Sequence, residues 1–199
     1  MFSHEELVMI AAKYATNQMN CGAVFKEHKC ATTREIVDVA AYRAGVMINI
    51  EAKATRSDFL KDKTKPHRKD PSRGVGHYRF YIAPKGLISV DELPERWGLL
   101  EVTNNATVKQ THVPSLIRCL VHKSAYLKRN DGLLNKKEKD TIEFFFDQCN
   151  EKGHMDYLYS AYRQLVMASQ AGEVINVNEV FEKPEILKGS CNVVKFNNH

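Results

Sequence analysis

The sequence predicts an α/β domain over residues 1–110, followed by a mostly helical region over residues 111–199. Two observations support this division. In the first region, one amphipathic helical segment precedes short runs rich in Val, Ile and aromatic residues, and Gly- or Pro-containing turns separate these runs. From Pro114 onward, the apolar residues recur at helical spacing instead. The change of pattern places the boundary between residues 104 and 113.

The composition is that of an ordinary globular protein. The chain of 199 residues is 43% hydrophobic and 27% charged, which suits one domain with a substantial core. A net charge of +5 permits a polyanionic partner without requiring one. No apolar run approaches the roughly 20 residues of a membrane-spanning helix, so we expect no membrane partner. The cysteines form no CxxC pairs, and a reducing cytoplasm is the expected compartment. Cys21, His28 and Cys30 could supply three zinc ligands, although buried thiols are the default expectation.

The first helix is expected over residues 4–19. Ser3 is a suitable N-cap, and Glu6 follows it at the spacing of a capping box. The helix is predicted to be amphipathic, because its apolar residues recur every three to four positions. The apolar stripe consists of Leu7, Ile10, Ala11 and Tyr14.

Residues 32–54 are expected to form a β-hairpin, because Val and Ile alternate along them and Ala44-Gly45 supplies a two-residue turn. This hairpin joins further strands in a central mixed sheet, and a short helix follows it over residues 57–64. A basic loop then runs from Pro66 to Gly76. The expected strands lie near residues 23–29, 35–42, 46–54, 78–83 and 97–102.

The second region is a candidate surface for homo-oligomer formation. Three consecutive phenylalanines, Phe144–Phe146, cannot all face one side of a helix, so at least one should pack against the α/β core or a second subunit. Tyr157, Tyr159 and Tyr162 could stack on bases, but a helix–helix core is the favoured interpretation. The expected helices cover residues 114–130, 134–153 and 154–172.

The hairpin register brings two carboxylates together. With Ala44-Gly45 as the loop, counting back along both strands places Asp38 directly opposite Glu51. Directly opposed residues have Cβ atoms about 5 Å apart. Lys53 lies two residues after Glu51 and therefore points to the same face of the sheet.

Two carboxylates at this distance repel each other unless a cation lies between them. The pair therefore predicts a hard divalent cation, most simply Mg²⁺. With Lys53 beside it, such a site suits the attack of water on a phosphodiester, because the metal neutralises phosphate charge and lowers the pKa of its bound water. The alternative is a solvent-exposed sheet face on which Asp38, Glu51 and Lys53 form a salt-bridge ladder.

These residues lie in a longer stretch that resembles the PD-(D/E)xK nuclease superfamily. That family's pattern, an Asp on one strand and (Asp/Glu)-x-Lys on the next, here reads Asp38 and Glu51-Ala52-Lys53. Val37 stands where the family has the Pro of its name. The resemblance covers about residues 20–110. More narrowly, the MmcB-like DNA-repair proteins and related phage nuclease-like proteins are similar to the runs REIVDVAAY, INIEAKATRSDFLKDK and YRFYIAPKGLISVDELPERWGLLEV.

The resemblance implies a restriction-endonuclease-like αβββαβ core. It also implies a DNA nuclease that hydrolyses phosphodiester bonds with Mg²⁺ or Mn²⁺, in the cytoplasm of a bacterial or phage-infected cell. Its catalytic residues would be Asp38, Glu51 and Lys53, with Asp38 and Glu51 as metal ligands. The family often adds a Glu from the first helix or strand, for which Glu27 and Glu6 are the candidates, although Glu6 is also the capping-box acid.

A basic segment follows the Glu51-Ala52-Lys53 motif, and such a segment suits contacts with the DNA backbone. A solvated loop is the alternative. A different class of function is a catalytically silent module of the same fold that binds DNA or a protein partner, but the complete catalytic set favours activity. A third is an assembly protein that oligomerises through its helical region. The expected DNA-binding residues are Lys61, Lys63, Lys65, Arg68, Lys69 and Arg73.

Overall fold

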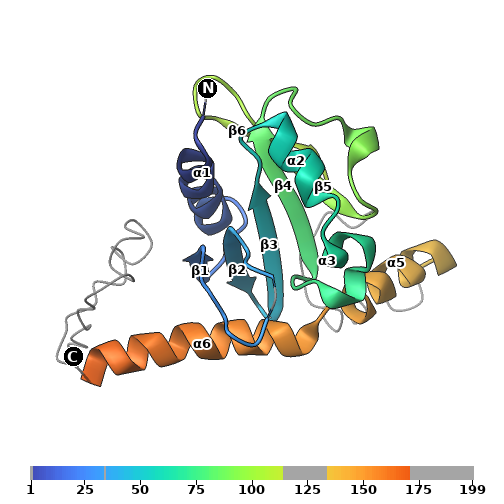
Figure 1. Cartoon of the computed structure of the whole chain (residues 1–199). Helices are drawn as coiled ribbons and strands as arrows, with labels where there is room; N and C mark the ends of the chain where they lie inside the picture. The colour runs from blue at the N-terminus through green and yellow to red at the C-terminus, as the bar shows by residue number, and fades with distance from the viewer. Residues whose placement is uncertain (1, 34, 114–133, 171–199) are drawn as a thin grey trace.

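The computed structural model of the chain describes residues 2–33, 35–113 and 134–170 (Figure 1). In this part of the chain, six strands form one mixed sheet with accompanying helices, which confirms the predicted α/β class. The strands are β1 (Ala23–Lys26), β2 (Val39–Arg43), β3 (Val46–Ala52), β4 (Tyr78–Pro84), β5 (Trp97–Val102) and β6 (Val108–His112). The helices are α1 (His4–Asn17), α2 (Arg56–Asp62), α3 (Pro66–Lys69), α5 (Lys136–Asp147) and α6 (Glu151–Gln170), with 3₁₀ turns η1 (Pro71–Arg73) and η2 (Val90–Glu92).

The strands lie in the sheet in their sequence order. β1, β2 and β3 form an antiparallel meander, β3, β4 and β5 are parallel, and β6 pairs antiparallel with β5. Parallel neighbours need a crossover connection, which the segment from α2 to η1 supplies between β3 and β4. Ala44 and Gly45 have φ angles of 45° and 81°, as a tight hairpin turn requires. The predicted register is confirmed, because Arg43 pairs with Val46.

The two faces of β3 carry different residues. Ile48 and Ile50 join the largest core cluster, together with residues of α1 and α5. On the other face of the sheet, Phe59 of α2 packs against Tyr81, which stacks on Trp97. Figure 1 shows α1 on one side of β3, and α2 with α3 on the other. Side-chain alternation therefore directs three polar residues, two of β3 and one immediately after it, toward α2 and α3: Asn49, Glu51 and Lys53.

The first helix begins where the sequence predicts. Ser3 is the N-cap of α1, and its capping box with Glu6 is complete. Leu7 and Ala11 are fully buried in the core beneath the helix. Ile10 and Tyr14 are partly buried and pack against the same core.

Several elements differ from their predicted bounds. β1 ends at Lys26, and β2 begins at Val39 instead of near residue 35, because α6 holds the preceding segment. The hydroxyl of Tyr157 accepts the N–H of Val37 at 3.1 Å and donates to the carbonyl of Glu35.

The basic segment 66–76, expected as a loop, contains α3 and η1. β6 was not predicted, since this exposed edge strand reads Val-Lys-Gln-Thr-His and lacks an apolar face. The expected helix over 114–130 lies outside the described residues.

The phenylalanines of α5 pack against the α/β core. Phe145 and Phe146 are buried and contact the ring of Tyr78. Phe144 lies under the guanidinium of Arg96, which is 4.3 Å from its ring centroid. Of the two expected alternatives, the α/β core and a second subunit, these rings contact the α/β core.

The tyrosines of α6 divide. Tyr157 is fully buried, but it packs against the sheet and the loops beside it, whereas Tyr159 and Tyr162 are 66% and 64% exposed. The expectation of a helix–helix core is therefore wrong for these tyrosines. Figure 1 shows α6 running beside the ends of β1 and β2 and extending past them. The helix closely approaches the segment before β4 at Gly153, where a Cβ atom would lie 2.7 Å from Cγ1 of Val75. None of the described helices is long and apolar enough to cross a membrane.

Replacing Phe145 by Ala should lower the free energy of unfolding by roughly 3–5 kcal/mol, because it empties a buried aromatic site between α5 and β4. Tyr162→Ala, at an exposed position, should change it by no more than about 0.5 kcal/mol. Urea titration followed by circular dichroism measures both values. Equal effects of the two substitutions would show that α5 contributes little to the core.

Candidate functional site

Asp38 lies immediately before β2, at the position that the hairpin register places opposite Glu51. Its Oδ2 atom accepts the N–H of Ala52 at 2.7 Å. Burial, and after it the negative charge of Glu51, raises the pKa of Asp38 to about 6. The repulsion between two carboxylates on one sheet face is therefore present in the folded protein.

Glu51 and Lys53 are buried side by side on β3, with exposed fractions of 1% and 5%. The Nζ atom of Lys53 lies 3.1 Å from Oε2 of Glu51 and 3.4 Å from Oδ1 of Asp62. This burial excludes the solvent-exposed salt-bridge ladder for Glu51 and Lys53. Both charges instead belong to an interior cluster, where each needs a partner.

Arg68 of α3 is the centre of this cluster. Its Nε atom lies 2.6 Å from Oδ2 of Asp62, and its Nη1 atom lies 2.5 Å from Oε1 of Glu35. Its Nη2 atom lies 3.1 Å from Oε1 of Glu51. The guanidinium also stacks over Trp97, 4.5 Å from the ring centroid. One buried side chain thus connects a loop, β3 and the end of α2.

Sequence reasoning missed two of these carboxylates. Glu35 and Asp62 are 3% and 2% exposed, yet the sequence places them at the start of an expected strand and near the end of an expected helix, where neither stands out. Glu35 accepts the N–H of Val75 at 2.8 Å, and Asp62 accepts the hydroxyl of Tyr81 at 2.7 Å. The spacing of Asp62 and Arg68, six residues apart, carries no signal by itself, because it does not correspond to one helix face.

Within the described part of the chain, the charges of this cluster balance. Glu35, Glu51 and Asp62 face Lys53, Arg68 and the half-exposed Lys65, whose Nζ atom is 2.7 Å from Asp62. Burial alone would raise the pKa of Glu51, but Arg68 and Lys53 hold it below its ordinary value. These native cations therefore neutralise Glu51 without help from a bound ion.

A second group of polar residues lies at the exposed side of Asp38. The Nε2 atom of His4 is 3.4 Å from Oε1 of Glu27 and 3.6 Å from Oδ1 of Asp38. One ligand atom from each of these three residues lies within 4.8 Å of the others, so they could hold a metal ion. His4 was not singled out in the sequence. Glu6, in contrast, is engaged in the capping box of α1.

The Asp38 end of the site suits a hard divalent cation better than the Glu51 end. Asp38 carries a raised pKa, and its neighbour Glu27 supplies a second, half-exposed carboxylate. Both oxygens of Glu51 already face cations of the protein. A metal bridging Asp38 and Glu51 therefore requires a rearrangement of the buried cluster.

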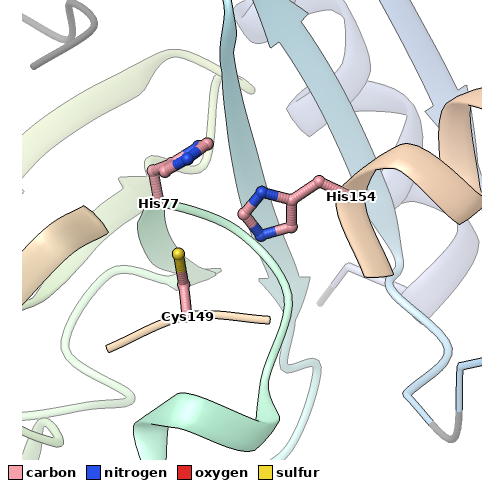
Figure 2. Close-up of side chains that lie close together, drawn as sticks. All are labelled: His77, Cys149 and His154. Carbon is pink, nitrogen blue, oxygen red and sulfur yellow. The ribbon is translucent and has the colours of Figure 1, made fainter. Parts of the chain in front are cut away.

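His77, Cys149 and His154 form a third group with metal-ligand chemistry (Figure 2). In His77, Nδ1 accepts the N–H of Met47 at 3.0 Å, and in His154, Nε2 accepts the N–H of Gly76 at 2.8 Å. A neutral imidazole has a single lone pair for accepting a bond. Because both lone pairs are used, this group does not fit a zinc ion. His154 instead attaches α6 to the segment before β4.

The cysteines considered as zinc ligands lie apart from one another. Cys21 belongs to the core cluster beneath α1, and Cys30 belongs to the cluster around Tyr157. Both are free, buried thiols, which confirms the expectation of buried thiols.

The predicted DNA-binding residues divide into exposed and buried ones. The exposed ones lie around α2, α3 and η1: Lys61, Lys63, Lys69 and Arg73. The ammonium of Lys65 forms an ion pair with the buried Asp62. The side chain of Arg68 is 1% exposed and bound to three carboxylates, so it is not part of the basic surface.

No family model and no curated protein matches this chain. Among solved structures, it is similar to a protein of unknown function from Silicibacter pomeroyi, SPO1766, with 16% sequence identity and a TM-score of 0.47. The similarity covers 88% of this chain and 98% of the other. Because that protein has no stated function, the likeness assigns no activity here.

Acid should destabilise the α6 attachment through His154. Burial lowers the pKa of His154 to about 3, below the value of about 6.5 in an unfolded chain. Between these values the unfolded chain binds the extra proton, so stability falls as the pH falls, by at most about 1.4 kcal/mol per pH unit for this group. His154→Gln retains an acceptor for Gly76 and does not titrate, and its stability should therefore fall less steeply from pH 6.5 to 4.5.

The measurement is urea unfolding across this pH range for both proteins. Other titrating groups, including Asp38 with its opposite sign, remain in both and cancel in the difference. His112→Gln, on the edge strand β6, serves as the control and should retain the wild-type slope. Identical slopes for wild type and His154→Gln would contradict the assignment.

Proposed function

We propose that this chain is a metal-dependent nuclease of the PD-(D/E)xK type that hydrolyses phosphodiester bonds in DNA with Mg²⁺ or Mn²⁺. The observation that carries the proposal is Asp38, a half-buried carboxylate that faces Glu51 and has a pKa raised to about 6. A carboxylate whose charge is destabilised in the folded protein is a suitable ligand for a cation. Lys53 on the same sheet face completes the set of residue types that hydrolysis requires.

The topology supports the same proposal. The elements from α1 to β4 follow the order α-β-β-β-α-β that the sequence resemblance implies, if α2 to η1 is counted as one crossover. β1 to β3 form the antiparallel part, and β4 adds in parallel. Asp38 and Glu51 stand at the paired ends of β2 and β3 in this arrangement.

In this proposal, Asp38 and Glu27 hold the divalent cation from the exposed side, next to His4. The bound ion would neutralise the scissile phosphate and lower the pKa of an attacking water. Glu51 fixes the ammonium of Lys53 at 3.1 Å, and Asp62 holds it from a second direction. Burial lowers the pKa of Lys53, but Glu51 and Asp62 raise it above its ordinary value, so the lysine stays charged. It can therefore stabilise negative charge but cannot act as a base.

A catalytically silent module is the second candidate function, and one observation favours it. Arg68 and Lys53 already neutralise Glu51, which removes the electrostatic need for a metal at that residue. A module of this kind would use its exposed lysines to bind DNA without cutting it. The two functions differ in whether Asp38 is needed for turnover.

Asp38→Asn should abolish Mg²⁺- or Mn²⁺-dependent cleavage of a mixed set of single-stranded, duplex and branched DNA. It removes the charge that binds the cation, while the amide oxygen can still accept the N–H of Ala52. Without metal, this variant should be more stable than the wild type at pH 8 by about 1–3 kcal/mol and should lose that advantage at pH 4. A carboxyl group with a raised pKa costs stability only when it ionises, as pH rises through about 6.

Asp91→Asn, at an exposed position in η2, is the matched control and should cut like the wild type. Absence of cleavage by the wild type under all these conditions, together with unchanged melting on metal addition, would favour the silent module. Full activity in Asp38→Asn would place the active site elsewhere.

Replacing Lys61, Lys63 and Lys69 together by Gln should weaken DNA binding and flatten its dependence on salt. If each lysine contacts one phosphate of duplex DNA, the slope of log K against log[salt] should decrease by about 3. Fluorescence anisotropy at several salt concentrations measures it. The matched control replaces Lys136, Lys137 and Lys139, which are exposed at the start of α5, by Gln. An equal loss in both triple variants would indicate a general charge effect instead of an interface.

A further inference from the structure

The side chain of Arg68 occupies the position of a cation among carboxylates from three separate segments. Glu35 precedes β2, Glu51 lies on β3, and Asp62 ends α2. The guanidinium contacts all three at 2.5 to 3.1 Å and is itself buried. His67 lies 3.4 Å from Glu35, but burial lowers the pKa of this imidazole, which therefore adds little positive charge. The guanidinium consequently carries the charge that a divalent ion would otherwise supply.

One contact in this cluster is weaker than the others. The Oε1 atom of Glu51 is buried and, among the described residues, has no partner with hydrogen-bond geometry, although Nη2 of Arg68 is 3.1 Å away. Asp62, by comparison, accepts well-formed hydrogen bonds from Arg68 and Tyr81. The arginine is thus held mainly by Asp62 and Glu35, and the Glu51 oxygen remains an incompletely satisfied ligand atom.

We propose that Arg68 is the built-in counter-cation of Glu51, and that a divalent cation engages Glu51 only when the Arg68 side chain withdraws from the cluster. This inference rests on the proposed function, to whose cation it adds Glu51 as a further ligand beside Asp38 and Glu27. With Arg68 in place, the cluster is neutral and does not attract a further cation. With Arg68 withdrawn, three carboxylates face two lysines, and the excess negative charge attracts a cation to the freed oxygen of Glu51.

The position of Arg68 permits such a movement. It belongs to α3, a helix of only four residues between the exposed Lys65 and Lys69. The N-cap residue of α3, Lys65, makes no capping hydrogen bond with its side chain, whose ammonium instead pairs with Asp62 at 2.7 Å. A guanidinium also pairs well with a phosphate, in the same forked geometry that it uses with carboxylates. Arg68 is therefore a positioning residue: it acts on the metal through Glu51 and does not touch the reacting atoms.

The test measures Mn²⁺ affinity by electron paramagnetic resonance of the free ion, using the full chain without DNA. Arg68→Gln should bind Mn²⁺ about tenfold more tightly than the wild type, because it removes the competing charge. Arg163→Gln makes the same change at an exposed position on α6 and should leave the affinity within about twofold of wild type. The double variant Glu51→Gln/Arg68→Gln should lose the gain, because the freed ligand is gone.

Two results would overturn the inference: an Arg68→Gln affinity equal to that of Arg163→Gln, or a gain that persists in the double variant. If Arg68→Gln does not fold, as judged by circular dichroism, Arg68→Lys is the second variant. The lysine keeps one positive charge but cannot span three carboxylates. Arg68→Lys should therefore bind Mn²⁺ about threefold more tightly than the wild type, and an unchanged affinity would overturn the inference. A gain in Mn²⁺ affinity without any DNA cleavage by the wild type would refute only the proposed nuclease function. DNA cleavage by the wild type, without a gain in Mn²⁺ affinity in Arg68→Gln, would refute only the role of Arg68.

Discussion

The interaction on which the rest of the structure depends is the burial of Arg68 among three carboxylates. Each buried charge would cost several kcal/mol without a partner, so the cluster needs a cation among its carboxylates. Completing it requires the loop before β2, the strand β3 and the end of α2 to meet at one point. This requirement fixes the crossover from α2 to η1 onto the sheet, where Phe59, Tyr81 and Trp97 provide the apolar surroundings.

Two carboxylates on the same sheet face have opposite environments. The cations of the interior cluster hold the pKa of Glu51 below its ordinary value, whereas burial and repulsion raise the pKa of Asp38 to about 6. Pairs of titratable groups whose environments push their pKa values apart are typical of functional sites. The cations of the interior cluster therefore stabilise the charge of Glu51. Asp38, at the boundary of the cluster with solvent, has a carboxylate whose charge is destabilised.

The helices after residue 133 are part of the same folded unit as the sheet. Phe145 and Phe146 belong to the core cluster that contains α1, and Tyr157 and His154 hold the segments that flank β2 and β4. The two histidines that resemble a metal site are hydrogen-bond acceptors for backbone N–H groups. His154 attaches α6 to the segment before β4, and His77 joins that segment to β3. The segment carrying Glu35 is attached to α6 through Tyr157.

The sequence by itself determined the local features. The Ala44-Gly45 turn fixed the register of the hairpin, and from this register the opposition of Asp38 and Glu51 could be predicted, because side-chain alternation is a local property of strands. The capping box of α1 and the strands β3 to β5 were also predictable from local pattern. The edge strand β6 was not, since its polar residues bury no face.

Only the tertiary structure decided which charges are buried. Arg68 stands among lysines in the sequence and reads as part of a basic surface, but α3 directs it inward. Glu35 and Asp62 lie 16 residues before and 11 residues after Glu51. The three carboxylates come together around Arg68 only because the crossover returns over the sheet. Burial and charge pairing depend on contacts between distant segments, and local sequence patterns contain no record of them.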